Sequence, residues 1–139
     1  MLIMSTTTVD SVLEYVVEKF VSRKRFGVCF ISSALLVHRL GKGDLVEGYL
    51  IFDSHRCYVR HYWCLIDGKD YDAGTIISIR LKIMQLPSRL SQTPPENYTY
   101  ISSLNHEELT ELEDGYQLYL TNRRKFWKTL RIGWLKKLL

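Results

Sequence analysis

The chain has 139 residues, of which 46% are hydrophobic and 24% are charged. This length and composition predict a single globular domain over residues 1–139 and exclude a disordered chain or a fibrous repeat. Seven of the 19 basic residues lie in residues 123–137, so the net charge of +4 comes from the C-terminal segment, and residues 1–122 carry 12 basic against 15 acidic side chains, a net charge of −3.

Two helices are predicted in the first 41 residues. Residues 8–23 carry apolar side chains at spacings of three and four, the pattern of an amphipathic helix: Val9, Val12, Leu13, Val16, Val17 and Phe20. Asp10 or a threonine just before it can cap the start of this helix. Residues 29–40 are apolar on most sides and are followed by Gly41, which predicts a second helix that is buried nearly all round.

The pattern then changes to that of β-strands. Residues 45–52, 57–66 and 75–86 are rich in β-branched and aromatic side chains, which predicts three strands. Between the second and third, Asp67 and Gly68 form the dipeptide that most strongly indicates a tight hairpin turn. Together the three segments predict an antiparallel meander.

The rest of the chain is predicted to be a loop followed by helices. Residues 86–97 contain three prolines and read as an irregular loop. Asn105 is a plausible cap for a short helix over residues 105–115, and a long basic amphipathic helix is expected over about 116–139. The whole order predicts an α+β fold in which helices pack on a small antiparallel sheet.

The hairpin places three polar side chains on one face of the sheet. Counting outward from a two-residue turn, His61 shares a face with Asp70 and Asp72, and Asp72 is its diagonal neighbour. Asp70 lies closer to the turn and is the weaker partner. A four-residue turn over 67–70 would keep Asp72 on this face but move it away from His61. A carboxylate that orients a histidine is the base half of a nucleophilic site.

Cys29 is the candidate nucleophile for this site. It stands where the second helix begins, and the dipole and free N–H groups of a helix N-terminus favour a thiolate. The same N–H groups could hold an oxyanion during acyl transfer. Residues 1–60 contain no Asn or Gln, so a side-chain amide before Cys29 cannot serve, and Tyr15 is the side-chain alternative.

The segments "FGVCFISSALLVHRLGKGDLVEGYLIF" and "RHYWCLIDGKDYDAG" together resemble the transglutaminase-like branch of the papain-like cysteine enzymes. The shared pattern is a cysteine that opens a buried helix, a strand with a glycine and an aromatic residue, a strand with histidine and tryptophan two places apart, and an aspartate on the next strand. The resemblance covers about residues 26–75. It implies a papain-like core without a cofactor or metal, in which Cys29 is the nucleophile, His61 the general base and acid, and Asp72 its orienting partner.

By this resemblance the chain is expected to be a thiol-dependent hydrolase or acyltransferase. Cys29 would attack an amide or ester carbonyl, most plausibly of a peptide or isopeptide bond, and pass the acyl group from a thioester to water or an amine. The expected partner is a peptide or protein substrate.

The other cysteines and histidines have structural interpretations. Cys57 and Cys64 fall on opposite faces of one strand and are expected to fill space. A zinc site from Cys57, His55 and His61 is an alternative, but it lacks a typical ligand spacing. His38, His55 and His106 are expected at the surface or in caps.

An odd number of cysteines indicates a reducing compartment. No apolar run approaches the roughly 20 residues that span a bilayer, and the first ten residues do not resemble a secretory signal. We therefore expect a cytoplasmic protein, in the host cytoplasm if its source is viral.

The segment 123–139 has two interpretations. Four apolar residues, Trp127, Leu130, Trp134 and Leu138, follow one helical stripe among basic side chains. This stripe can dock on the sheet and leave the lysines in water. Alternatively, residues Arg123 to Lys137 can bind an anionic membrane surface, the phosphates of a nucleic acid or a protein partner. The second interpretation makes the protein a non-enzymatic binding module.

Overall fold

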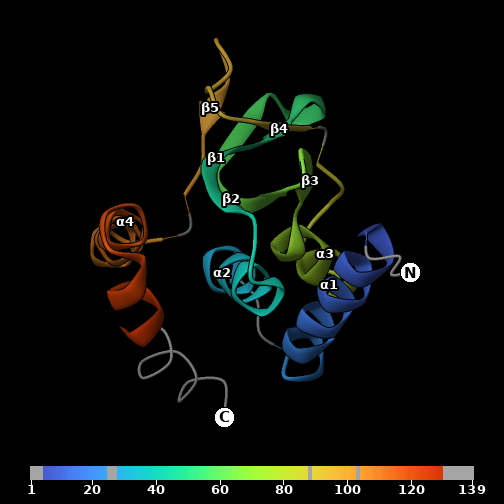
Figure 1. The fold of residues 1–139 in the computed structure, drawn as a ribbon. Helices are drawn as coiled ribbons and strands as arrows, with labels where there is room; N and C mark the ends of the chain where they lie inside the picture. The colour runs from blue at the N-terminus through green and yellow to red at the C-terminus, as the bar shows by residue number, and fades with distance from the viewer. Residues whose placement is uncertain (1–4, 25–27, 88, 103, 130–139) are drawn as a thin grey trace. The chain divides into compact units, whose positions relative to one another are not determined.

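The computed structural model describes residues 5–24, 28–87, 89–102 and 104–129. The chain divides into two compact units, Met1–Ile101 and Ser102–Leu139. The first is an α+β unit that contains the helices α1 (Ser5–Ser22), α2 (Cys29–Leu40) and α3 (Ala73–Arg80) and the whole sheet (Figure 1). Its strands are β1 (Asp44–Phe52), β2 (Cys57–Ile66), β3 (Lys69–Tyr71), β4 (Arg89–Ser91) and β5 (Thr99–Tyr100), with a 3-10 turn η1 (Asp53–His55) before β2.

The sheet is built around the long β1–β2 hairpin. Its order is β3-β2-β1-β4, and β5 pairs with β2 in parallel at its first residues. The tight turn at Asp67 and Gly68 has positive φ at both residues, 52° and 77°, and sets Cys64 opposite Tyr71 and Leu65 opposite Asp70. The predicted two-residue turn and its register are therefore confirmed up to Tyr71.

The three helices of this unit pack against one another on one side of the sheet (Figure 1). α2 begins at Cys29 and ends before Gly41, which takes the left-handed conformation at φ 68°, so its predicted bounds are confirmed. It is also buried as predicted: Phe30, Ile31, Ser32, Ser33, Ala34, Leu36 and Val37 are all buried. The Ser33 hydroxyl donates to the carbonyl of Tyr62, which joins α2 to β2.

α1 presents its apolar stripe to this core through Val9, Val16, Val17 and Phe20. The predicted cap is wrong, because α1 is already helical at Ser5 and Asp10 lies exposed inside it. The apolar stripe fixed which face is buried, but it did not fix where the helix begins.

The predicted third strand, 75–86, is wrong. Its first residues belong to α3, and the antiparallel strand after the turn, β3, ends at Tyr71. The reason is a helix cap: the side chain of Asp72 accepts a hydrogen bond from the backbone N–H of Thr75. Tertiary packing then overrides the weak strand preference of the isoleucines, and Ile77 is completely buried.

The segment predicted to be a loop, 86–97, contains a short strand. Arg89–Ser91 forms β4 and pairs with Tyr49–Ile51 of β1. A three-residue edge strand depends on its partner for stability, so no local sequence pattern marks it.

The second unit contains α4 (His106–Thr121). Asn105 caps it, and Glu108 completes a capping box, so the predicted cap is confirmed. The predicted boundary near Tyr116 is wrong, because α4 runs through Gly115 and ends before Asn122, after which residues 123–129 are again helical. The Phe126 ring packs edge-on against Tyr119 at a centroid distance of 5.4 Å. Leu130, Trp134 and Leu138 of the predicted stripe lie outside the described residues.

Within the described part of the chain, every helix is too short or too polar to span a bilayer.

Candidate active site

Cys29 is the first residue of α2. The residue before it, Val28, provides no side-chain cap for the helix. The first N–H groups of a helix have no intrahelical acceptor, so they point outward beside the Cys29 backbone. The Cys29 side chain is half-buried and its thiol is free. Its neighbour on one side is Gly74 of α3, whose backbone lies directly against the Cys29 backbone.

His61 lies in the middle of β2, opposite Gly48 of β1, and only 4% of its surface is exposed. Trp63 is on the same face of the strand and stacks beside the imidazole, with 6.3 Å between ring centroids and 22° between ring planes. A side chain at residue 48 would collide with the Trp63 ring, so the absence of one at Gly48 makes room for the indole. This packing holds the His61 ring in one orientation.

Asp70 does not bind His61. It accepts a hydrogen bond of 3.0 Å from Nε1 of Trp63 and so fixes the indole that stacks on His61. Asp70, predicted to be the weaker partner of His61, therefore binds the neighbouring Trp63 instead.

Asp72 is the partner of His61. Nε2 of His61 and Oδ1 of Asp72 are 2.7 Å apart, and the two side chains are 5% and 15% exposed. The diagonal contact expected from the turn is thus present, although Asp72 reaches it as the cap of α3 and not as part of a strand. The predicted cross-strand pairs beyond Tyr71 do not form.

Thr75 provides two further hydrogen bonds to the Asp72 carboxylate. Its backbone N–H donates to Oδ1 of Asp72 at 3.1 Å, and its hydroxyl donates to Oδ2. The hydroxyl also lies 3.3 Å from Nε2 of His61. Three donors therefore hold one buried carboxylate, which fixes its position relative to the imidazole.

The electrostatics of His61 follow from these contacts. Burial alone lowers the pKa of the imidazole, but the hydrogen bond to Asp72, the interaction with Cys29 and the negative charge of Asp72 outweigh burial and raise the pKa of His61 to about 10. Because Nε2 faces Asp72, Nδ1 is the ring nitrogen left for the Cys29 thiol. The structure therefore places Cys29 and Asp72 beside the His61 ring, with a hydrogen bond between His61 and Asp72.

The remaining predicted residues lie elsewhere. Tyr15, the side-chain alternative for an oxyanion donor, packs under the guanidinium of Arg39 at 4.2 Å from the ring centroid. Arg39 is in the last turn of α2, so Tyr15 is at the opposite end of this helix from Cys29, and that prediction is wrong. His38 and His106 are exposed, and each lies on or beside a helix end.

The alternative zinc site is not formed. His55 is exposed in η1 and hydrogen-bonds to Ser54, whereas His61 is buried and bound to Asp72. Among the described residues, no group of three or more His, Cys, Asp or Glu side chains could hold a metal ion. Cys64 is fully buried and donates to the carbonyl of Ser33, and burial raises the pKa of its thiol to about 12.

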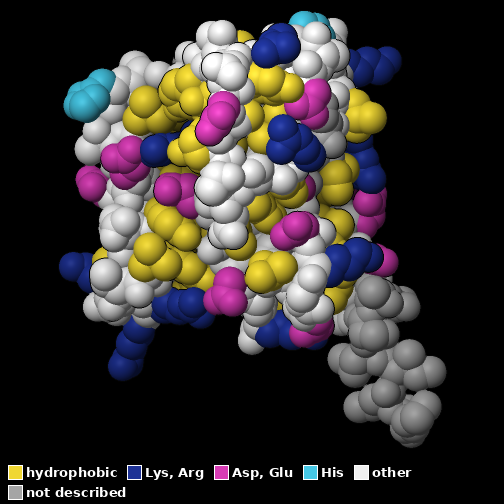
Figure 2. Space-filling model, turned by 90° about the horizontal axis from the view of Figure 1, so that it is seen from above, with side chains coloured by type: hydrophobic (Ala, Val, Ile, Leu, Met, Phe, Trp, Pro, Cys, Tyr) yellow, Lys and Arg dark blue, Asp and Glu magenta, His cyan; other side chains and the backbone are white. Residues whose placement is uncertain are grey.

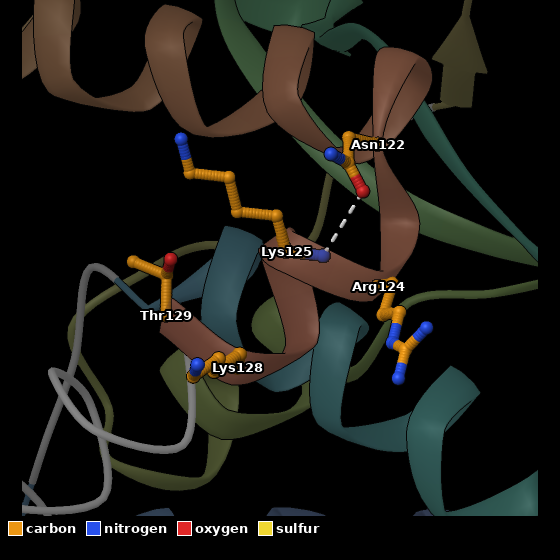
Figure 3. Close-up of a pocket in the computed structure, with 5 residues that line it drawn as sticks. All are labelled: Asn122, Arg124, Lys125, Lys128 and Thr129. Carbon is orange, nitrogen blue, oxygen red and sulfur yellow. Dashed lines mark hydrogen bonds between the residues drawn. The ribbon is translucent and has the colours of Figure 1, made fainter.

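A separate feature of the second unit is a cavity of about 500 Å³ at the start of the helical segment 123–129. It is lined by Asn122, Arg124, Lys125, Lys128 and Thr129 (Figure 3). Oδ1 of Asn122 accepts a hydrogen bond from the backbone N–H of Lys125. The Arg124 and Lys125 side chains extend in opposite directions, so their charged ends do not converge (Figure 3).

The surface shown in Figure 2 has no single dominant sign of charge. Lysine and arginine side chains are interspersed with acidic ones on this face. A wide basic surface of the kind that binds nucleic acid is not seen from this side.

Sequence reasoning missed Thr75, Gly74 and the Trp63–Asp70 hydrogen bond. The contact between Thr75 and Asp72 had a partial local signal, since aspartate is a preferred N-cap residue whose side chain accepts from the backbone N–H three residues later. The other two depend on contacts between distant or opposed segments, which no local pattern reveals. No family model, curated protein or solved structure matches the chain, so the interpretation of this site depends on its own geometry.

Proposed function

We propose that the protein is a thiol-dependent hydrolase or acyltransferase with a papain-like, transglutaminase-like core. The observation that carries the proposal is the part-buried 2.7 Å hydrogen bond between His61 and Asp72, on a ring whose pKa is also raised by Cys29 at the start of a helix. A nucleophile, a base and an orienting acid in this order are the components of covalent acyl transfer.

The first half of the reaction forms a thioester. Nδ1 of His61 already holds the proton given up by Cys29, as the raised pKa of His61 favours, and the sulfur attacks the carbonyl carbon of an amide or ester. Backbone N–H groups at the start of α2 hold the oxyanion of the tetrahedral intermediate. His61 then gives its proton to the leaving amine or alcohol, the carbon–leaving-group bond breaks, and the acyl group stays on Cys29.

The second half releases the acyl group. Water or an amine gives a proton to Nδ1 of His61 and attacks the thioester carbonyl, and the returning proton restores the thiol as the carbon–sulfur bond breaks. Asp72 keeps Nε2 protonated throughout, so Nδ1 is the nitrogen that exchanges protons. The proposed substrate is a peptide or protein with a peptide or isopeptide bond, and no cofactor or metal takes part.

The three free thiols support a reducing compartment, and we assign the protein to the cytoplasm on this ground.

The test compares the rates at which iodoacetamide alkylates the three cysteines, read by peptide mass spectrometry. Cys57 and Cys64 serve as controls within the same chain. At pH 7 we expect Cys29 to react at least ten times faster than Cys57, and His61→Ala to remove most of that difference. Acylation by a p-nitrophenyl ester, with release of p-nitrophenol and a thioester on Cys29, tests the covalent step. A Cys29 that reacts no faster than Cys57 would refute the proposal.

The second candidate function is a non-enzymatic binding module. Three basic side chains, Arg124, Lys125 and Lys128, line the cavity of the second unit and favour it, because even basic side chains that do not converge on one point attract the many phosphates of an anionic surface. The partner would be an anionic membrane surface or a nucleic acid bound through Arg123 to Lys137. Binding to anionic vesicles or to nucleic acid that weakens with salt and disappears on deletion of residues 123–139 would support it. No binding at low salt would exclude it.

A further inference from the structure

The backbone of Gly74 lies so close to Cys29 that there is no room for a side chain at residue 74. A Cβ atom at residue 74 would lie 2.7 Å from both Cα and Cβ of Cys29 and 3.4 Å from its backbone nitrogen. The φ angle of Gly74 is not in the left-handed region, so its backbone would accept an alanine. The nearest obstacles to a side chain here are therefore Cα and Cβ of Cys29.

We propose that Gly74 is a positioning residue for Cys29, an inference that rests on the proposed function. Two residues before it, Asp72 caps α3 and orients His61. One residue after it, Thr75 fixes Asp72 through its backbone and its hydroxyl. The segment 72–75 therefore contacts both His61 and Cys29. Asp72 fixes the orientation of the imidazole, and Gly74 fixes the position of Cys29 relative to the imidazole.

The size of the expected effect follows from the contact distances. A Cβ contact under 3.0 Å forces a shift and one of 3.4 Å is ordinary van der Waals contact, so an alanine at residue 74 must move α3 and the start of α2 apart by about 0.3–0.7 Å. The atoms that must move belong to the first turn of α2 and cannot rotate away as a side-chain end can. A displacement of about 1 Å at a reacting group costs about 100-fold in rate. We expect Gly74→Ala to slow the reaction of Cys29 by about 10- to 100-fold.

The experiment measures Cys29 alkylation by iodoacetamide and acylation by a p-nitrophenyl ester in the full chain. The variants are Gly74→Ala, His61→Ala and the double variant. The control is Gly41→Ala at the other end of α2, where φ is +68° and no atom lies within 4 Å of the added Cβ. Gly41→Ala strains the backbone of the same helix without contacting Cys29, so it should leave the Cys29 rate unchanged.

A positioning role predicts a specific pattern of rates. Gly74→Ala slows Cys29 and leaves Cys57 unchanged. In the His61→Ala background, the same substitution has little further effect, because the pairing it disturbs is already lost. Independent, multiplicative effects of the two substitutions would indicate a merely structural role and overturn the proposal.

The outcomes also separate this proposal from the proposed function. If His61→Ala slows Cys29 and Gly74→Ala does not, the proposed function stands and the role of Gly74 is refuted. If His61→Ala has no effect on Cys29, the proposed function fails, and the role of Gly74 fails with it. If Gly74→Ala does not fold, the contact between Gly74 and Cys29 serves the fold itself, and the positioning role is overturned.

Discussion

Asp72 has two roles, and two substitutions separate them. It caps α3 and it orients His61. Asp72→Asn keeps an oxygen that can accept from the Thr75 N–H and from Nε2–H of a neutral imidazole, and its amide can donate to the Thr75 hydroxyl. Asp72→Ala removes every one of these hydrogen bonds. The asparagine variant should therefore lose the charge and keep the cap, whereas the alanine variant loses both.

The expected stabilities follow from the contacts. Loss of the cap costs about 1 kcal/mol, and a buried N–H of His61 left without an acceptor costs about 1–3 kcal/mol more. Asp72→Ala should thus lower the free energy of unfolding by about 2–4 kcal/mol, which in a unit of this size lowers Tm by roughly 10–30 °C. Asp72→Asn loses only the extra strength of the charged hydrogen bonds, about 1 kcal/mol.

The expected rates differ from the stabilities. Both variants remove the carboxylate that fixes the tautomer of His61, so both should slow ester acylation of Cys29 by about 10²- to 10⁴-fold. Thermal unfolding followed by circular dichroism and the release of p-nitrophenol measure the two properties. Equal Tm values for the two variants would refute the capping argument. A wild-type acylation rate in Asp72→Asn would refute the orienting role.

Three further predictions follow from the same contacts. Gly48→Ala forces its Cβ into Trp63 and into the Ser91 carbonyl, so it should lower the free energy of unfolding by about 1–3 kcal/mol in urea titrations; an unchanged midpoint would contradict the packing described. Thr75→Val removes the hydroxyl that donates to Asp72 and should slow Cys29 acylation more than Thr75→Ser, which retains a hydroxyl; equal rates would exclude the hydroxyl's role. The pKa of His61 is raised in the folded chain from 6.5 to about 10, so its proton stabilises the fold fully below pH 6.5, and this contribution is lost as the pH rises to about 10. The stability difference between wild type and His61→Ala should therefore shrink over this range, and a difference that grows with pH would contradict the sign of the shift.

Much of the fold around the site could be predicted from local patterns. The Asp67–Gly68 turn determined the register that brings Asp72 near His61, because positive φ at both residues permits only one tight connection. Gly41 and the apolar run before it gave the bounds of α2, and hence the position of Cys29 at its start. These features depend on residues that are adjacent in sequence.

The secondary-structure predictions were wrong where a helix cap or a strand distant in the sequence determines the local structure. The isoleucines after Thr75 favour a strand, but the hydrogen bonds of Asp72 begin a helix there, and packing of Ile77 stabilises it. The strand β4 exists because β1 offers it an edge. The contact between Gly74 and Cys29 joins two helices far apart in the chain, so the sequence marks Gly74 only as a small residue.

The two halves of the candidate site differ in how far apart they lie along the chain. His61 and Asp72 are separated by 11 residues and are joined through a tight turn, so their pair is a short-range contact. Cys29 lies 32 residues before His61 and reaches it only when α2 docks on β2. Short-range contacts form faster than long-range ones. During synthesis Cys29 emerges first, and it can contact His61 only after the segment from His61 to Thr75 has been made and has folded against it.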